Sequence, residues 1–228
     1  MQRKSRRTIL RRIFKPAWLY FLLKKLTPLS HNFGSNRGEP IDRYYIEKFL
    51  LENSGFIKGV SLEVEDDIYT KKFGKENIVQ SDILDIDFNN PKAAIRGDLR
   101  NLKKMPDNKY DCIILTQVLQ FIDDYDSAIK ECYRILKSGG VLLATLPFIS
   151  RIDGRTGPAG DYWRFALASA KYIFEKHFSS SNIEIKSWGN VLSGLAFWVG
   201  MAQEELSQKE LDYRAPDFPV IISIRATK

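Results

Sequence analysis

Three acidic residues stand at the ends of three short apolar segments in the first half of the chain. Glu63 follows GVSL, Asp82 follows NIVQS, and Asp98 follows AAIRG. We expect each segment to be a strand, and a ligand of a parallel sheet sits at the carboxyl ends of its strands. Carboxylates accept hydrogen bonds and attract cations. Three of them along one edge therefore favour a ligand with hydroxyl groups and an amine, such as a nucleoside with an ammonium group.

The elements that would carry these acids alternate between strand-like and helix-like segments. Strands are predicted at residues 59–64, 77–83, 93–99, 110–119, 141–148, 182–188 and 219–228, and helices at residues 40–50, 166–178 and 191–206. Another helix begins near residue 124, and Gly139 and Gly140 are expected to end it. The apolar segment 191–206 is predicted to be buried in the core. This alternation predicts a Rossmann-like, doubly wound α/β fold, a mostly parallel seven-stranded sheet with helices on both faces.

The composition is that of a soluble globular protein. The 228 residues are 44% hydrophobic and 28% charged, so no large disordered region is needed to explain them. Cys112 and Cys132 have neither metal-ligand nor disulfide spacing, and no metal site is predicted. We therefore expect two reduced, buried thiols in a cytoplasmic protein.

The positive charge is concentrated at the beginning of the chain. Nine lysines and arginines precede residue 30, and the first acid is Glu39. Because the whole chain carries a net charge of +7, the remainder carries −2. The sequence thus predicts a basic N-terminal extension at residues 1–38 and one folded domain at residues 39–228.

An apolar run from Ala17 to Leu23 lies within this extension and is too short to span a bilayer. One hypothesis is a peripheral contact of residues 1–25 with an anionic membrane surface. The other is a helix that packs Trp18, Phe21 and Leu22 onto the domain. Nucleic acid is disfavoured as a partner because the rest of the chain adds no basic groove.

Several segments, in order, resemble the class I S-adenosylmethionine (SAM)-dependent methyltransferases, of the methyltransferase type 11 kind. They are LEVEDD, SDI, RGDLRNLKKMPDNKYDCIILTQVLQFIDD, ILKSGGVLLATLP and GDYWRF, and the resemblance covers roughly residues 40–228. RGEPIDRYYIE, DYWRF and GNVL also resemble small methyltransferases associated with glycosyltransferases and polysaccharide biosynthesis. The resemblance implies SAM as the cofactor and a saccharide or related small molecule as the acceptor, methylated on oxygen.

The resemblance also implies a role for each residue at the predicted strand ends. Glu63 matches an acid that lies beside the methionine part of the cofactor, and Asp82 matches the acid that takes the ribose hydroxyls. Asp98, with Leu99, matches the position that contacts adenine. Gln117 is expected to line the pocket near the methyl group.

The turn after Glu63 departs from the family pattern. Glu65 and Asp67 stand where the family commonly has glycines, which let the backbone approach the cofactor. Carboxylates there attract the cationic sulfonium and amine of SAM but repel its carboxylate. In one hypothesis the turn is rebuilt, Asp66 or Asp67 caps the following helix, and Glu65 joins the cofactor contacts. In the other, the fold persists without a cofactor, as a non-catalytic module that binds a partner or a membrane.

Asp161 and Arg164 are the candidate catalytic residues. They follow the polar, glycine-rich loop ISRIDGRTGPAG, which we expect to form a lid over the acceptor. The alternative is that an Asp161–Arg164 contact simply fixes the turn. Asp42 and Arg43 are further candidates for closing the pocket from the opposite side.

Overall fold

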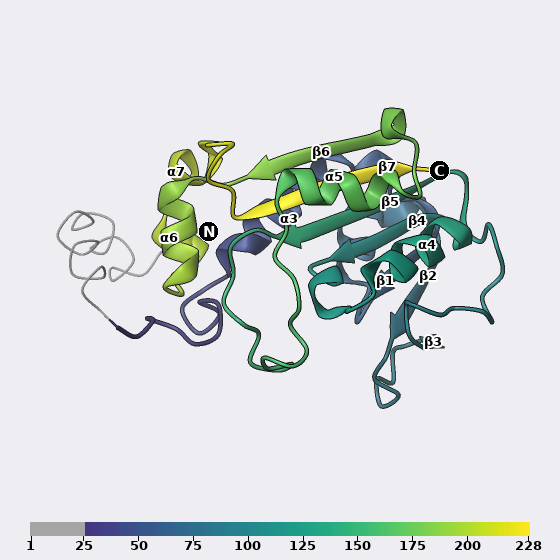
Figure 1. Ribbon diagram of the computed structural model, residues 1–228, viewed down its shortest axis with the longest axis horizontal. Coiled ribbons are helices and arrows are strands. Elements are labelled where there is room, and N and C mark those ends of the chain that lie inside the picture. The colour runs from purple at the N-terminus through teal and green to yellow at the C-terminus, as the bar shows by residue number, and fades with distance from the viewer. Residues whose placement is uncertain (1–25) are drawn as a thin grey trace. The chain divides into compact units, whose positions relative to one another are not determined.

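The computed structural model describes residues 26–228, and the predicted contact segment at residues 1–25 lies outside the described residues (Figure 1). The described chain divides into two compact units. The first comprises residues up to 45 together with 149–151 and 188–220, and the second comprises residues 46–148, 152–187 and 221–228. The predicted boundary at residue 38 falls inside the first unit and stays a prediction.

The sheet has seven strands in the order β3-β2-β1-β4-β5-β7-β6. The strands are β1 (Gly59–Val64), β2 (Ile78–Asp85), β3 (Ile95–Arg96), β4 (Tyr110–Thr116), β5 (Leu136–Pro147), β6 (Ile183–Trp188) and β7 (Ile221–Thr227). β1 pairs in parallel with both β2 and β4, whereas β7 is antiparallel to β5. The predicted fold class is confirmed. Strand order reverses between β1 and β4, the point at which such sheets bind ligands.

The helices are α3 (Ile41–Glu52), α4 (Tyr125–Ile135), α5 (Leu167–Glu175), α6 (Val191–Trp198) and α7 (Gln208–Asp212). α4 begins after Asp124, whose carboxylate accepts a hydrogen bond from the backbone N–H of Ser127 at 3.0 Å. The prediction that Gly139 and Gly140 end this helix is wrong. The chain turns into β5 at Leu136, and both glycines lie within that strand.

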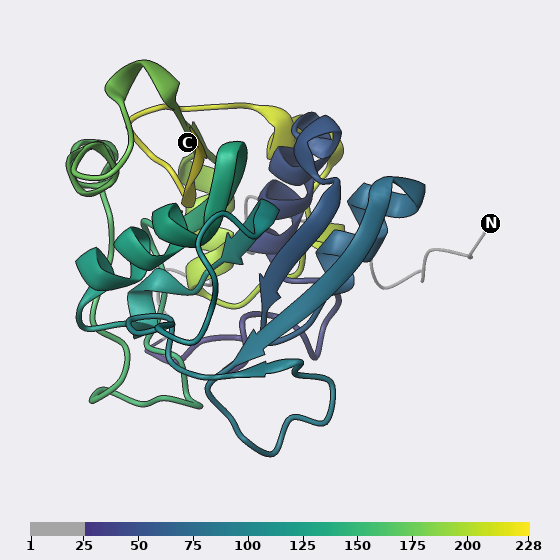
Figure 2. The same ribbon diagram turned by 90° about the vertical axis from the view of Figure 1, so that its right-hand side faces the viewer.

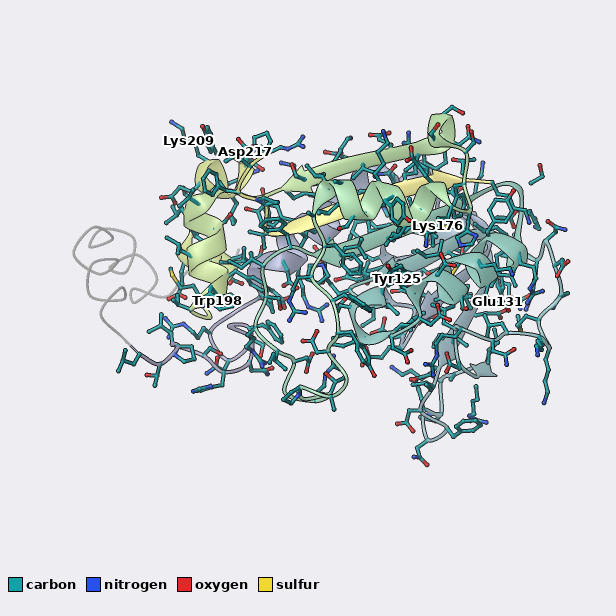
Figure 3. The ribbon with its side chains drawn as sticks, in the orientation of Figure 1. Tyr125, Glu131, Lys176, Trp198, Lys209 and Asp217 are labelled. Atoms are coloured by element: carbon teal, nitrogen blue, oxygen red, sulfur yellow. The ribbon has the colours of Figure 1, made fainter. Side chains whose placement is uncertain are left out.

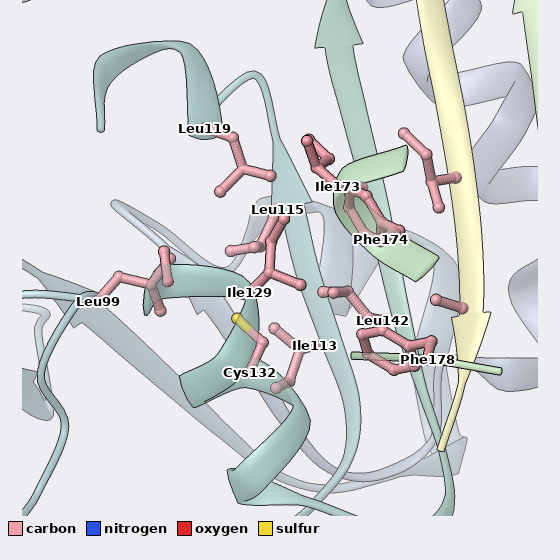
Figure 4. Packing of buried hydrophobic residues seen from close by; sticks show 14 of the residues in the cluster. Leu99, Ile113, Leu115, Leu119, Ile129, Cys132, Leu142, Ile173, Phe174 and Phe178 are labelled. Carbon is pink, nitrogen blue, oxygen red and sulfur yellow. The ribbon is translucent and has the colours of Figure 1, made fainter. Parts of the chain in front are cut away.

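The hydrophobic core of the second unit packs α4 and α5 against one face of the sheet (Figure 4). Ile113 and Leu115 of β4 point into this layer, where they meet Cys132 of α4 and Phe174 of α5. Alternate residues of a strand face the same side, which explains why the two β4 residues share one layer. Cys112 and Cys132 are both buried and free.

The second strand is longer than predicted. β2 continues to Asp85, so the prediction that the strand ends at residue 83, with Asp82 as the acid at its end, is wrong. The physical reason is that Ile83 and Leu84 are buried and remain in register with β1, opposite Glu63 and Val64. Figure 2 shows β1 and β2 side by side.

The apolar helix of the first unit is shorter than predicted and only half buried. α6 ends at Trp198, and Gly200 follows with a left-handed φ of 80°. Val191, Leu195 and Trp198, spaced as one helical face, are exposed (Trp198 is labelled in Figure 3). The prediction of a buried core helix therefore holds for only one side of α6. Within residues 26–228, no helix is long and apolar enough to cross a membrane.

Candidate functional site

The turn after β1 has the backbone shape of a glycine turn although it contains a glutamate. Glu65 has a φ of 73°, in the left-handed region that glycine adopts most readily. Its N–H donates to the carbonyl oxygen of Leu84 at 3.0 Å, and its carbonyl accepts from the side-chain amide of Asn90 at 2.9 Å. The surrounding contacts therefore hold the turn against β2.

Glu63 also holds this turn in place, through hydrogen bonds to its backbone. Its carboxylate is buried and accepts the backbone N–H groups of Tyr69 (3.2 Å) and Thr70 (2.7 Å), where η2 (Thr70–Gly74) begins. Burial raises the pKa of Glu63 to about 7, against the opposing effect of these hydrogen bonds. The structure thus places the Glu63 carboxylate against the chain's own backbone.

The other two acids of the turn bind locally. Asp66 accepts the backbone N–H of Ile68, two residues further on, at 3.1 Å, which is an Asx turn. The predicted cap by Asp66 or Asp67 is not found at η2, whose N-cap is Tyr69 without a side-chain hydrogen bond. Asp67 forms an ion pair with Lys71 at 2.8 Å. Both carboxylates are therefore bound by groups within a few residues of the turn.

Asp82 lies within β2, away from its carboxyl end. Its carboxylate binds Lys109 (2.6 Å), the hydroxyl of Tyr110 (2.9 Å) and the amide of Gln80 (2.7 Å). Burial alone would raise the pKa of Asp82, but these hydrogen bonds and the charge of Lys109 lower it below its usual value. Asp82 therefore does not stand at the end of the strand, where the sequence placed it, and its ribose contact stays a prediction.

Asp85 occupies the place at the strand end that was expected for Asp82. It adjoins Leu84, to which the turn is hydrogen-bonded, and its carboxylate accepts from Asn90 (2.7 Å) and from the backbone of Asp87 (2.8 Å). Ile86 follows with 66% of its surface exposed. The apolar Ile-Leu pair between Asp82 and Asp85 was the signal in the sequence that the strand continues.

Asp98 and Leu99 follow β3, and their side chains differ in surroundings. The Asp98 carboxylate binds the guanidinium of Arg100, which lowers its pKa, and Arg100 also pairs with Asp123. Leu99 packs in the hydrophobic core (Figure 4). Of the two, only Asp98 presents a polar group, and an adenine contact there remains a prediction.

Two glutamines lie at the carboxyl end of β4. Gln117 has a φ of 56°, and its N–H donates to the carbonyl of Thr145 at 3.0 Å. Gln120, which the sequence analysis missed, donates its side-chain amide to the carbonyl of Gln117 at 2.8 Å. Its side-chain oxygen is buried without a hydrogen-bond partner. A buried acceptor without a partner is uncommon in folded proteins.

The predicted lid is held together by the candidate catalytic pair. Asp161 is bound by both terminal nitrogens of Arg164, at 2.6 and 2.9 Å, and also accepts the backbone N–H of Asp153 at 2.9 Å. The contact that fixes the turn is therefore present. The Asp161 carboxylate already accepts three hydrogen bonds within the chain. A catalytic role for Asp161 and Arg164 stays a prediction.

The same loop reaches the turn after β1. Arg155 binds the Glu65 carboxylate through Nη1 at 3.0 Å. Its backbone N–H donates to Asp153 at 2.8 Å. The loop and the turn, 90 residues apart in sequence, are thereby joined by one ion pair.

Aromatic side chains adjoin the lid. The indole of Trp163 donates to the carbonyl of Ile122 at 2.9 Å, and its ring meets Tyr125 edge to face at 5.3 Å (Tyr125 is labelled in Figure 3). Tyr162 and Trp163 are partly exposed. These faces form an apolar surface on which a ring could pack.

Two further points of the sequence analysis concern Asp42 and Arg43, as candidates for closing the pocket, and the absence of a predicted metal site. Asp42 and Arg43 belong to α3 in the first unit, where burial raises the pKa of Asp42 to about 6. Across the described part of the chain, no group of three or more histidines, cysteines and acids is arranged to hold a metal ion.

Residues 57–144 match the family model described as "Methyltransferase domain". Demethylmenaquinone methyltransferase of Listeria monocytogenes serotype 4a is 28% identical over 117 residues, which are 51% of this chain and 44% of the relative. The chain thus spans less than half the length of this curated relative.

Two solved structures illustrate the similarity in fold. A SAM-dependent methyltransferase from Archaeoglobus fulgidus has a TM-score of 0.56 at 17% identity, covering 82% of this chain and 94% of that one. Phosphoethanolamine N-methyltransferase 2 of Haemonchus contortus, in complex with SAM, also has a TM-score of 0.56 at 17% identity, covering 81% and 52%. The domain match and the fold together support SAM as the cofactor.

Proposed function

We propose that the protein is a SAM-dependent methyltransferase that acts on a small-molecule acceptor. The matched methyltransferase domain spans the strands whose carboxyl ends form the site, from β1 into β5. The observation that carries the proposal is the left-handed turn at Glu65, which is held beside the strand-end carboxylate of Asp85. This is the backbone conformation that glycine adopts most readily, held here by a residue with a side chain.

The residues at this edge fit the chemistry of SAM. Asp85 is an acceptor-only carboxylate, suited to the ribose hydroxyls, and the exposed side chain of Ile86 offers an apolar surface to the adenine ring. Bound SAM would supply a methyl group on a positively charged sulfur. The acids of the turn favour that positive charge, and Gln117 and Gln120 would place amide groups at the end of β4.

The acceptor remains a proposal in two forms. The resemblance to polysaccharide-associated enzymes favours an oxygen of a saccharide, and the matched relative acts, by its name, on demethylmenaquinone. The partly exposed rings of Tyr162 and Trp163 suit either a sugar face or an aromatic ring. Positioning of the acceptor against the methyl group would supply much of the rate.

The test is transfer of a 13C-labelled methyl group from SAM to nucleotide sugars and to a reduced naphthoquinone, read by NMR. The carbon shift distinguishes an O-methyl from a C-methyl product, so each acceptor class has its own signature. Asp85→Asn is expected to abolish transfer, and Asp87→Asn, on an exposed neighbouring acid, is the matched control. If neither acceptor is labelled and SAM does not bind, the non-catalytic alternative takes the place of this proposal.

Peripheral membrane contact through residues 1–25, in a cytoplasmic protein, is a separate proposal. Its support is the set of nine positive charges before residue 30 and the short apolar run among them. The full chain is expected to float with phosphatidylserine-containing vesicles but not with phosphatidylcholine alone, and high salt should release it. Equal flotation with both vesicle types would contradict an electrostatic contact.

A further inference from the structure

The turn after β1 creates an electrostatic problem for the proposed cofactor. Glu65, Asp66 and Asp67 follow one another in the turn, and Asp85 lies at the neighbouring strand end. The methionine part of SAM carries a carboxylate as well as an ammonium group. This carboxylate would be repelled by an edge so rich in acids unless a cation stood beside it.

Arg155 is the cation that reaches this turn from the loop. Its Nη1 lies 3.0 Å from Oε1 of Glu65, and its Nη2 lies 3.4 Å from Oδ2 of Asp153. The side chains of Arg155 and Glu65 are 70% and 66% exposed, so both face solvent at the surface of the site. A guanidinium has five N–H donors in a planar fork, which can serve a second carboxylate while it holds the first.

Other cations near the edge already bind specific acids. Arg100 bridges Asp98 and Asp123, and Lys71 pairs with Asp67. Their carboxylate partners compete directly with a ligand for the same donors. Arg155 is also paired, with Glu65 and with Asp153, but Glu65 is the residue whose charge the ligand would otherwise meet.

The loop holds Arg155 in place through a series of carboxylate contacts. Asp153 accepts the backbone N–H of Arg155, and the backbone of Asp153 is in turn held by Asp161. Asp161 is fixed by Arg164. This gives the Asp161–Arg164 pair a positioning role, in which it keeps the loop folded so that Arg155 reaches the turn.

We infer that Arg155 is a specificity-determining residue that pairs with the carboxylate of SAM and offsets the charge of Glu65. The inference rests on the proposed function, since it concerns the same cofactor site. In this inference, the positive charge of Arg155 in the loop offsets the negative charge of Glu65, which stands where the family commonly has glycine. Binding of SAM should therefore depend on Arg155 only through the carboxylate of the ligand.

The experiment compares SAM with decarboxylated SAM, which keeps the adenosine, sulfonium and amine but lacks the carboxylate. Both ligands are titrated by calorimetry into the full chain, into Arg155→Gln and into Lys130→Gln. The last variant removes one positive charge from an exposed position in α4 and serves as the matched control. Melting curves check that each variant is folded.

Arg155→Gln is expected to weaken the binding of SAM by about fivefold, because an ion pair at an exposed side chain is weak. The affinity for decarboxylated SAM should stay within about twofold, and Lys130→Gln should affect neither ligand. Arg155→Lys should restore part of the affinity for SAM.

An equal loss for both ligands would overturn the inference, because Arg155 would then act on the turn and not on the carboxylate. An unchanged affinity for SAM would also overturn it. Suppose that decarboxylated SAM binds the wild-type protein and that either of these two contradicting results is seen. The proposed cofactor site then stands, and only the role of Arg155 is refuted. If neither ligand binds the folded wild-type protein, the proposed function itself fails, and the inference with it.

Discussion

Glu63 is predicted to make the fold less stable as the pH rises toward neutrality. The side chain is 2% exposed, and burial raises its pKa from an ordinary value of 4.5 to about 7. Between these two values the folded protein keeps a proton that the unfolded chain has released. Stability therefore falls as the pH rises, because the unfolded state binds fewer protons.

The magnitude follows from the two pKa values. A pKa raised from 4.5 to about 7 corresponds to about 3 kcal/mol of unfolding free energy. The stabilisation is fully present below pH 4.5, declines by about 1.4 kcal/mol for each pH unit above it, and is lost once the pH passes the folded value.

The assay is urea unfolding of the wild-type protein and of Glu63→Gln across this pH range. Glutamine does not titrate, so the difference between the two unfolding free energies isolates Glu63 from the other acids. We expect this difference to change by about 3 kcal/mol in favour of the variant as the pH rises from about 4.5 to above 7. Glu76→Gln, on an exposed glutamate, is the control for removal of a carboxylate. A difference that does not vary with pH would refute the reasoning.

Three further substitutions test the structure elsewhere. Asp82→Asn removes the charge that pairs with Lys109 and should cost about 3 kcal/mol in urea unfolding while leaving SAM affinity within about twofold; a selective loss of SAM affinity would instead restore Asp82 to the cofactor site. Asp124→Ala removes the N-cap of α4, which accepts the N–H of Ser127, and should lower the free energy of unfolding by about 1 kcal/mol in thermal unfolding. An unchanged melting temperature would contradict a role of that cap in stability. Asp161→Asn should loosen the lid and accelerate tryptic cleavage at residue 155, whereas an unchanged cleavage rate would show that other contacts hold the loop.

The fold could be predicted because local patterns of hydrophobic residues indicate each strand and helix. The apolar run at β4 and the helical spacing in α4 each identify an element without knowledge of its neighbours. The acid at the carboxyl end of β2, which we propose for the ribose hydroxyls, could not be identified in the same way. Asp82 and Asp85 both stand in a short strand-like segment, and the register of β2 against β1 decides which one reaches the edge.

The site itself depended on contacts between distant residues. A glutamate gives no local sign that its φ will be left-handed, since its side chain disfavours that conformation and the bond to Leu84 holds it there. The pairing of Glu65 with Arg155 joins residues 90 positions apart, and no spacing rule connects them. Gln120 was overlooked because a buried amide in an apolar segment has no distinctive pattern.

The most direct test of the central claim, that this acidic turn still holds a working cofactor site, is calorimetric titration of the full chain with SAM. We predict micromolar binding that Asp85→Asn weakens by at least about tenfold and that Asp82→Asn leaves nearly unchanged. A folded protein that gives no binding signal at millimolar SAM would contradict the account, because the glutamate at the turn would then have closed the site.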